Sequence, residues 1–429
     1  MEGLIIKQTA KLKYQQNLGI KEHALLIGEK KEEINELKRL SATAGIKVKK
    51  ALYNNKQNID PAYFIGKGKL NHIMKYINNN NINVVIFDDE LSPAQHRNLS
   101  DALNTKIIDR TQLILDIFAQ HAHTKESKIQ VELAQLEYLL PRLKGKGTEL
   151  SRLAGGIGTR GPGETKLEID RRRIEKKIHR LKKQLKEIEK NRKTQRKNRK
   201  DPLITLVGYT NAGKSTLMNL LTDADSKVAD KLFATLDSTL RKMELPNGRN
   251  VILSDTIGFI NRLPHQLVAS FKATLEEIYN ADILIHVIDI NSEQIKEKIE
   301  TVNEVLQDLE INNKKIVKVF NKIDMVNEEK VNTLKLLYPD SIFISAAKEK
   351  GKDKLIKNLN QIIKKSMVTI KFEFPYEKAY LVEKIYEEGK VMKEKYLNDH
   401  IFLKASISNQ LAQKLSNFQK NNSSDNKVN

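Results

Sequence analysis

The chain has 429 residues, with 75 Lys and Arg against 54 Asp and Glu, which gives a formal net charge of +21. This length suits two to four domains, and the charge favours a polyanionic partner, either nucleic acid or an acidic membrane surface. The absence of cysteine excludes disulfide scaffolds, cysteine-ligated metal sites and thiol catalysis. No apolar run approaches the roughly 18 residues that a transmembrane helix needs, and the acidic Glu2 argues against a signal peptide. We therefore expect a cytoplasmic protein and leave peripheral membrane contact open.

Residues 1–122 alternate strand-like with helix-like segments, a pattern that predicts a small parallel sheet with covering helices. The expected strands are 24–27, 46–52, 84–87 and 107–108, and the expected helices are 31–43, 70–77, one starting at Ser92-Pro93, and 111–119. Three consecutive acids, Asp88, Asp89 and Glu90, follow the third strand, and we interpret them as a solvated strand end rather than a metal site. His121 and His123 are interpreted as part of a linker.

The positive charge is concentrated in residues 141–200, which hold 22 Lys and Arg against 7 Asp and Glu. This stretch carries apolar residues at spacings of 4, 3, 4 and 3, and a second stretch upstream has spacings of 4, 3 and 4 before Pro141. Such spacings are typical of a two-helix coiled coil, so residues 123–200 are predicted to form an antiparallel helical hairpin. The two seams are Ile174, Ile178, Leu181, Leu185 and Ile188, and Ile129, Leu133, Leu136 and Leu140.

The arms are expected to be joined by Arg142 to Glu164, a segment with five glycines in nine residues. It contains G-x-G-x-x-G, but no strand precedes it and Pro162 follows, so a dinucleotide fingerprint is excluded. Two interpretations stay open: a flexible tip without a role, or a loop whose bare backbone presses against a phosphate backbone. Candidate RNA contacts of the loop and helix are Arg152, Thr159, Arg160, Arg171, Arg172, Arg180, Arg192, Arg196 and Arg199.

The apolar run Leu203 to Val207 leads into G-x-x-x-x-G-K-S, from Gly208 to Ser215, and then into a helix-like stretch. This strand, loop and helix order is typical of a phosphate-binding loop, in which backbone N–H groups wrap the phosphates. We predict that Lys214 offsets the β and γ charge and that the Ser215 hydroxyl is a ligand of Mg²⁺.

Three more motifs follow in the order that a guanine-nucleotide switch requires. Asp255-Thr256-Ile257-Gly258 places an acid near Mg²⁺ and an amide near the γ-phosphate. Asn321-Lys322-Ile323-Asp324 supplies a carboxylate for guanine, and Ser345-Ala346-Ala347 completes the base pocket. Together these motifs predict a GTPase. The predicted GTP contacts are Gly208, Tyr209, Thr210, Asn211, Ala212, Gly213, Lys214, Ser215, Phe233, Ala234, Thr235, Leu236, Asp237, Asp255, Thr256, Ile257, Gly258, Asn321, Lys322, Ile323, Asp324, Ser345, Ala346 and Ala347.

The catalytic group is not identified by the sequence. Thr235 is the candidate for the second Mg²⁺ hydroxyl, with Thr239 as the rival, and Lys214, Thr235 and Gly258 are candidate transition-state supports. Phe259 stands where Ras-like enzymes carry a water-orienting glutamine, so slow intrinsic hydrolysis is expected. Asn211 in the phosphate loop suggests a K⁺ ion beside the phosphates as a second cofactor.

At this point the sequence resembles the HflX family of ribosome-associated GTPases over roughly residues 20–365. The resemblance rests on Val131 to Leu136, Leu140 to Leu143, Gly155 to Thr165, Asp170-Arg171-Arg172 and the nucleotide motifs, although Ser238 replaces the usual proline. It implies a GTPase that binds the large ribosomal subunit and its RNA and helps to dissociate stalled or idle ribosomes. Separately from the resemblance, we expect a monomer.

The segment after the nucleotide motifs is expected to be a small α+β appendage. The predicted domains are therefore 1–122, an N-terminal α/β domain; 123–200, the basic hairpin; 201–366, the GTP-binding domain of doubly wound α/β type; and 367–429, a C-terminal domain with a disordered tail. Two other functions stay open. One is a GTPase of large-subunit assembly, and the other is a membrane-associated regulatory GTPase whose basic helix meets anionic lipid.

Overall fold

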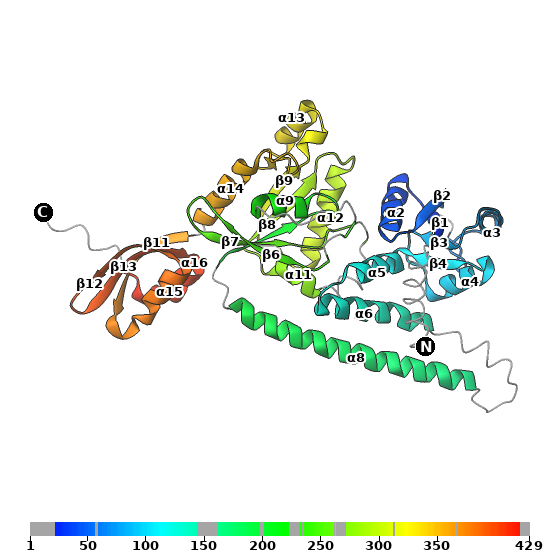
Figure 1. Ribbon diagram of the computed structural model, residues 1–429, viewed down its shortest axis with the longest axis horizontal. Helices are drawn as coiled ribbons and strands as arrows, with labels where there is room; N and C mark the ends of the chain where they lie inside the picture. The colour runs from blue at the N-terminus through cyan, green and yellow to red at the C-terminus, as the bar shows by residue number, and fades with distance from the viewer. Residues whose placement is uncertain are drawn as a thin grey trace.

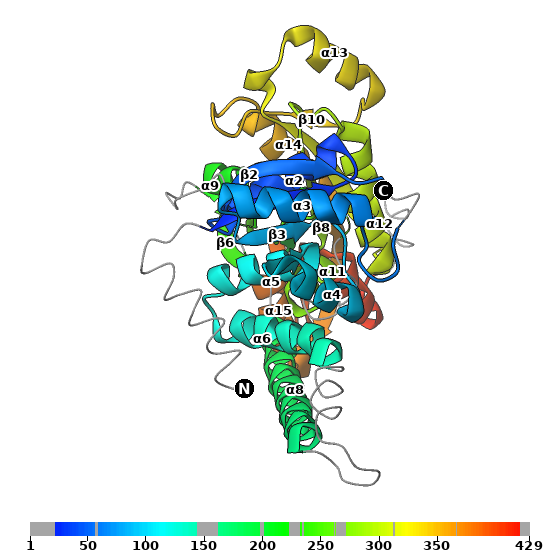
Figure 2. The same ribbon diagram turned by 90° about the vertical axis from the view of Figure 1, so that its right-hand side faces the viewer.

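A computed structural model of the chain describes residues 22–55, 59–143, 162–197, 201–222, 232–233, 236–260, 262, 272–311, 314–365 and 367–420 (Figures 1 and 2). It confirms the predicted fold class, because a parallel α/β unit, a helical hairpin, a doubly wound sheet and a small α+β unit follow one another along the chain. None of the described helices combines the length and the apolar character needed to cross a bilayer.

The N-terminal sheet is fully parallel, with strand order β2-β1-β3-β4. Alternate residues of its strands face opposite layers: Leu26 and Ile86 pack toward α2 and α5, whereas Leu25 and Val85 pack toward α3 and α4. The elements are β1 (His23–Gly28), α2 (Lys31–Thr43), β2 (Lys47–Tyr53), α3 (Lys67–Asn80), β3 (Val84–Phe87), α4 (Pro93–Leu103), β4 (Lys106–Asp109) and α5 (Arg110–His121).

The predicted antiparallel hairpin is present. Helix α6 (Lys125–Leu139) ends in the 3-10 turn η2 (Leu140–Leu143), which contains Pro141, and it packs on the long helix α8 (Pro162–Lys197). The expected start of the second arm was wrong, because the helix begins at Pro162, inside the segment assigned to the loop. Proline suits a first helical position, where its missing N–H is not needed. The two seams meet in one cluster: Ile129, Leu133, Leu136, Ile174, Ile178 and Leu181, with Leu140, Leu143, Leu185 and Ile188 at its edge.

The central domain has a six-stranded sheet of order β10-β9-β8-β5-β7-β6, in which only the edge strand β6 runs antiparallel among the described strands. Buried apolar residues of β5 and β8 form its middle. The elements are β5 (Leu203–Val207), α9 (Lys214–Thr222), β6 (Thr239–Glu244), β7 (Asn250–Asp255), α11 (Lys272–Tyr279), β8 (Ile283–Asp289), α12 (Ile295–Asp308), β9 (Lys315–Asn321), η3 (Ile323–Met325), α13 (Glu328–Leu337), β10 (Ile342–Phe343) and α14 (Lys352–Lys365).

The C-terminal unit is a three-stranded antiparallel sheet, ordered β11-β13-β12, with helices packed on one face. It agrees with the α+β expectation, and the predicted disordered tail from Asn421 onward lies outside the described residues. The elements are β11 (Met367–Pro375), η4 (Tyr376–Lys378), α15 (Tyr380–Glu388), β12 (Lys390–Tyr396), β13 (His400–Ser408), α16 (Asn409–Lys414) and η5 (Ser416–Phe418).

The N-terminal and central domains share a hydrophobic core. Phe233 of the central domain packs edge-on against Phe118 of α5, with ring centroids 4.8 Å apart. Ile257 and Ile260, which follow β7, belong to the same cluster as the α2 and α5 face of the N-terminal sheet. The segments on either side of the nucleotide site are thus anchored on the N-terminal domain.

Candidate nucleotide site and its junction with the N-terminal domain

The loop after β5 has the close backbone packing that a phosphate-binding loop needs. A Cβ at Gly208, whose φ is +151°, would lie 2.3 Å from the Val287 carbonyl oxygen. A Cβ at Gly213 (φ +92°) would lie 2.3 Å from the Asn321 amide nitrogen. Only glycine fits at these two positions, and the loop then opens into α9 at Lys214.

Lys214 is held inside the loop. Its buried ammonium group donates hydrogen bonds to the carbonyl oxygens of Gly208 (3.1 Å) and Tyr209 (3.0 Å). Burial lowers the pKa of Lys214 to about 8, and the Asp255 carboxylate partly opposes this shift. Phosphate oxygens would supply the negative charge that this buried cation lacks.

Two of the predicted metal-site residues lie together. The Ser215 hydroxyl donates to Oδ2 of Asp255 over 2.6 Å, at the point where α9 begins and β7 ends. A hydroxyl and a carboxylate are hard oxygen donors of the kind that Mg²⁺ prefers, so this pair fits the ion. Within the described ranges no cluster of three or more His, Asp or Glu suits a metal.

The backbone after Asp255 crosses directly over the phosphate-binding loop. A Cβ at Gly258 would lie 2.7 Å from the Thr210 Cα and 3.0 Å from the Lys214 nitrogen, so no side chain fits there. Phe259 forms a backbone bridge with Tyr209, and its ring is buried in the central-domain core with Ile278. The phenyl ring thus faces away from the phosphate-binding loop, and it supplies no group that could orient water.

The guanine-recognition motifs are joined to the loop by their polar groups. The Asn321 amide donates to the Ala212 carbonyl oxygen (2.9 Å) and accepts from the Ala346 N–H (2.9 Å). Lys322 donates to the Asn211 carbonyl oxygen (2.8 Å), and the Ser345 hydroxyl donates to Asp324. These bonds connect three separate motifs in the arrangement that a guanine pocket requires.

The predicted contacts of the segment 233–237 need correction. Phe233 and Leu236 are buried in the cluster shared with the N-terminal domain. The Asp237 carboxylate accepts hydrogen bonds from the N–H groups of His123 (3.0 Å) and Thr124 (3.2 Å) and from the Thr124 hydroxyl (2.6 Å). The side chains of Phe233 and Leu236 therefore contact the N-terminal domain, and that of Asp237 contacts the residues before helix α6, rather than the nucleotide.

The two threonine candidates are placed differently. Ala234 and Thr235 lie outside the described residues, so the assignment of Thr235 stays a prediction. The rival, Thr239, begins β6 directly opposite Asp255 in the strand register.

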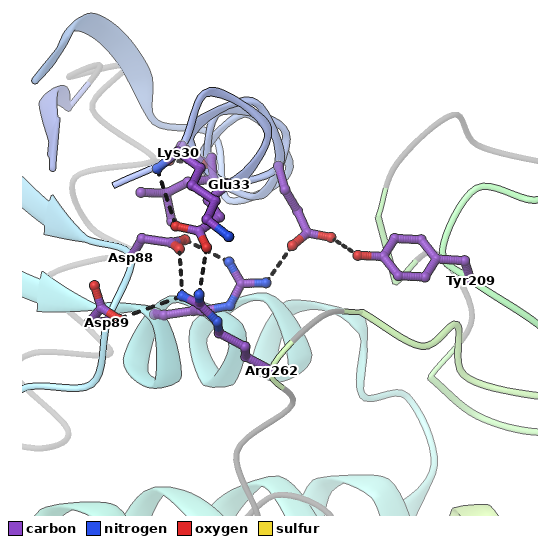
Figure 3. Close-up of polar contacts among 10 residues, drawn as sticks. Lys30, Glu33, Asp88, Asp89, Tyr209 and Arg262 are labelled. Atoms are coloured by element: carbon purple, nitrogen blue, oxygen red, sulfur yellow. Dashed lines mark hydrogen bonds and ion pairs between the residues drawn. The ribbon is translucent and has the colours of Figure 1, made fainter. Parts of the chain in front are cut away.

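The side chains of three other predicted GTP contacts, Thr256, Ile257 and Tyr209, are bound to other parts of the protein. The Thr256 hydroxyl donates to the Leu206 carbonyl oxygen (2.7 Å), and Ile257 is buried in the domain junction. The Tyr209 hydroxyl donates to Glu36 of α2, so this ring extends from the phosphate-binding loop to the N-terminal domain (Figure 3). For Tyr209, Thr256 and Ile257 only the backbone is available to a nucleotide.

A polar network at this junction was not foreseen from the sequence. Arg110 of α5 donates to Glu36 (2.6 Å) and to Asp88 (2.7 Å), and Glu36 also accepts from Tyr209 (Figure 3). The solvated strand end expected at Asp88 was wrong, because this carboxylate is 1% exposed. Burial raises the pKa of Asp88 to about 6, while the charge of Arg110 opposes the shift.

Arg262 extends the network to the segment beyond Gly258. Its guanidinium lies 2.5 Å from Glu33, 3.6 Å from Asp89 and 3.8 Å from Asp88, measured between nitrogen and carboxylate oxygen (Figure 3). No local sequence signal predicts these pairs, because the partners are far apart in the chain. We name the seven residues that share these contacts the junction network: Glu33, Glu36, Asp88, Asp89, Arg110, Tyr209 and Arg262.

The junction network borders a cleft of about 720 Å³ between the two domains. Its walls come from α2 on one side and from the phosphate-binding loop and α12 on the other. The cleft adjoins Tyr209 and Thr210, so it is continuous with the nucleotide site.

The described RNA-contact candidates lie on α8. Arg171 and Arg172 form ion pairs with Glu175 (2.8 Å) and Glu168 (2.7 Å) on the same helix. Arg192 pairs with Glu126 of α6 (2.7 Å), which makes it a brace of the hairpin, whereas Arg180 is exposed. Arg152, Thr159, Arg160 and Arg199 lie outside the described residues, as does the side chain of Arg196.

Three families match successive parts of the chain. The family described as GTP-binding GTPase N-terminal matches residues 31–119, GTP-binding GTPase Middle Region matches residues 121–199, and 50S ribosome-binding GTPase matches residues 203–322. A relative named GTPase HflX, from Caldanaerobacter subterraneus subsp. tengcongensis, is 48% identical over 410 residues, which cover 93% of this chain and 94% of the relative.

A second curated relative and one solved structure are also similar to this chain. GTPase HflX of Escherichia coli is 41% identical over 368 residues, which cover 85% of this chain and 86% of that protein. Among solved structures, the crystal structure of SsGBP in complex with GDP is 28% identical, has a TM-score of 0.48, and is matched over 80% of this chain and 98% of that chain.

Proposed function

Because this chain belongs to the HflX family of GTPases, we propose that its hydrolysis of GTP controls binding to the large ribosomal subunit and the dissociation of stalled or idle ribosomes. The basic hairpin contacts ribosomal RNA, and the nucleotide state sets the strength of that contact. We propose that the protein binds ribosomes and hydrolyses GTP in the cytoplasm.

One observation carries this proposal. On α8 the face opposite the apolar seam presents Lys176, Arg180, Lys183 and Lys190, all of them exposed. No ion pair or hydrogen bond occupies these four side chains within the described residues. Long helices that serve only as structural braces commonly pair their charges, whereas a stripe of solvated cations suits a phosphate backbone.

The nucleotide site is connected to the hairpin along the chain and through the junction. Helix α8 ends at Lys197, and β5, which leads into the phosphate-binding loop, begins at Leu203. Asp237 in the segment before β6 binds Thr124, the residue that caps α6. A change in the phosphate-binding loop on GTP binding would therefore act on the C-terminal end of α8, and a change in the segment before β6 would act on the N-terminal end of α6.

The site chemistry follows the same proposal. Mg²⁺, held by Ser215 and reached by Asp255, would offset phosphate charge when bound. Lys214 and the Gly258 amide bind the γ-phosphate oxygens and stabilise the charge that develops there, and Thr235 remains the proposed second hydroxyl.

Sedimentation with ribosomes tests the function. We expect the protein to sediment with large subunits in the presence of a non-hydrolysable GTP analogue more strongly than with GDP, and to convert intact ribosomes into subunits. Replacing Lys176, Arg180, Lys183 and Lys190 by alanine should weaken this binding by about 100-fold at low salt and leave GTP affinity unchanged, because each phosphate contact releases counterions.

A matched control carries the same change of charge on another helix. Lys354, Lys357, Lys364 and Lys365 are exposed on α14, and their replacement by alanine should leave sedimentation almost unchanged. If both variants lose ribosome binding equally, the loss depends only on the net charge of the protein, and the proposal is overturned. Binding to immature large subunits without any splitting would favour the assembly function, and binding to anionic liposomes without ribosomes would favour the membrane function.

We also propose that K⁺ assists hydrolysis. Asn211 has a left-handed φ of +62°, and its carbonyl oxygen already accepts from Lys322, so its side chain is the group free to turn toward the phosphates. Phe259 has no polar group that could orient the attacking water, so we propose that K⁺ stabilises the charge on the phosphates instead. We therefore expect GTP hydrolysis to be about tenfold faster in potassium than in sodium buffer. Asn211→Leu should remove the difference, and equal wild-type rates in the two buffers would exclude this role.

A further inference from the structure

The C-terminal sheet has one packed face and one open face. Helices α15 and α16 lie on one side of the sheet (Figure 1). Strand residues Phe372, Leu403 and Ala405 form the core of the domain with Ile385 of α15 and Leu411 of α16. The opposite face consists of the alternate strand positions, which remain exposed or partly exposed. We call it the open face and define it by Thr369, Lys371, Glu373, Lys390, Lys393, Lys395, His400, Phe402, Lys404 and Ser406.

The open face carries a row of lysines across all three strands. Lys404 on the central strand β13 lies directly opposite Lys371 of β11 on one side and Lys393 of β12 on the other. Like charges that face each other across a sheet destabilise it, so fold stability does not account for this row. Lysines on edge strands serve to prevent unwanted strand pairing, but this explanation does not extend to Lys404 on the central strand.

The charge of the open face is almost wholly positive. Lys390, Lys393, Lys395 and Lys404 have no ion-pair or hydrogen-bond partner among the residues that the structure describes. Its single carboxylate, Glu373, is offset by Lys420 at 2.6 Å and lies 3.6 Å from His400. The open face is therefore complementary to a polyanion.

An aromatic ring lies beside this row. Phe402 of β13 is partly exposed on the open face, between Glu373 and Lys395 in the strand register, and it is not part of the domain core. A ring on a central strand, next to Lys395 across the sheet and to Lys404 along its own strand, is an arrangement that can stack an unpaired base while its phosphates are bound. An acidic protein surface would use the lysines but would gain little from the ring.

We infer that the open face binds single-stranded RNA, with the lysine row on the phosphates and a base stacked on Phe402. This site is separate from the hairpin and does not depend on ribosome binding. It gives the C-terminal domain a function of its own.

The test measures the affinity of the full-length protein for a fluorescent uridine oligomer of about 12 nucleotides and for a duplex of equal length. The hairpin variant without the four cations of α8 serves as the starting protein, so that the hairpin contribution is reduced. We expect Lys393→Ala with Lys404→Ala to weaken binding of the single strand by about tenfold and to reduce the salt slope by about 1.4, which is about 0.7 for each lysine. The control, Lys354→Ala with Lys357→Ala on α14, should change neither value.

The ring gives a second, independent readout. Phe402→Leu keeps an apolar side chain in the sheet, and we expect it to weaken single-strand binding by about fivefold or more without changing the salt slope, whereas Phe402→Tyr should retain affinity. Unchanged thermal unfolding and GTP affinity would verify that each variant is folded. If Phe402→Leu binds the oligomer as the starting protein does, or if the lysine variants lose single strand and duplex equally, the inference is overturned.

Discussion

Lys214 shows how strongly one residue of this site depends on its ligand. In the structure its ammonium group is buried against two carbonyl oxygens, and burial lowers its pKa to about 8. Without nucleotide, a group with this pKa is about half protonated at pH 8. The phosphates of a bound nucleotide favour the charged form, so binding should raise the pKa and take up protons.

Calorimetry measures this linkage directly. We expect GDP binding to take up protons, and the uptake to grow from pH 7 to pH 9, because the free protein loses the Lys214 proton over this range. The uptake is obtained from binding enthalpies in buffers that differ in ionisation enthalpy. The GDP phosphates are fully ionised at pH 8 and 9, so they add nothing there. An uptake that does not grow with pH would show that Lys214 stays charged in the free protein.

Among the elements, the segment after β7 is the one that links the two domains. Its backbone crosses the phosphate-binding loop at Gly258, its Ile257 and Ile260 are buried against the N-terminal domain, and Arg262 pairs with Glu33 (Figure 3). The segment that we propose contacts the γ-phosphate is thus bound on its other side by α2. The N-terminal domain is therefore placed to respond to the nucleotide.

Removing one contact should loosen this link. Arg262→Ala deletes its ion pairs with Glu33, Asp88 and Asp89. Because Arg262 is 46% exposed, we expect the free energy that holds the two domains together at this point to fall by about 1 kcal/mol at most. Amide hydrogen exchange in the peptides that hold Glu33 and Ile257 should become up to about fivefold faster, since local opening becomes easier.

Arg241→Ala provides the comparison. Arg241 donates to Asn219 within the central domain (3.3 Å), so its loss should leave the exchange of both peptides unchanged. Equal exchange in wild-type protein and Arg262→Ala would mean that the apolar contacts alone hold the junction.

For the whole molecule, periodic and local patterns predicted the fold, whereas contacts between distant segments were missed. The seam of Ile174 and Ile178 and the glycines of the phosphate-binding loop act through neighbours at short, regular spacing, so their structure was predictable. Asp88, at the end of strand β3, was misread because its partner, Arg110, begins helix α5, 22 residues further along the chain. The burial of Phe233 against Phe118 likewise joins two domains, and no spacing in the sequence records it.

The length of α8 has a mechanical consequence. A helix of 36 residues is about 54 Å long, and its C-terminal end is separated from β5 only by residues 198–202. A tilt of about 5° at that end would displace the opposite end, where the glycine-rich segment is attached, by roughly 5 Å, from the helix length alone. If the proposed nucleotide switch tilts α8 at this end, the length of the helix would turn a small rotation into a displacement large enough to engage or release a surface bound at its far end.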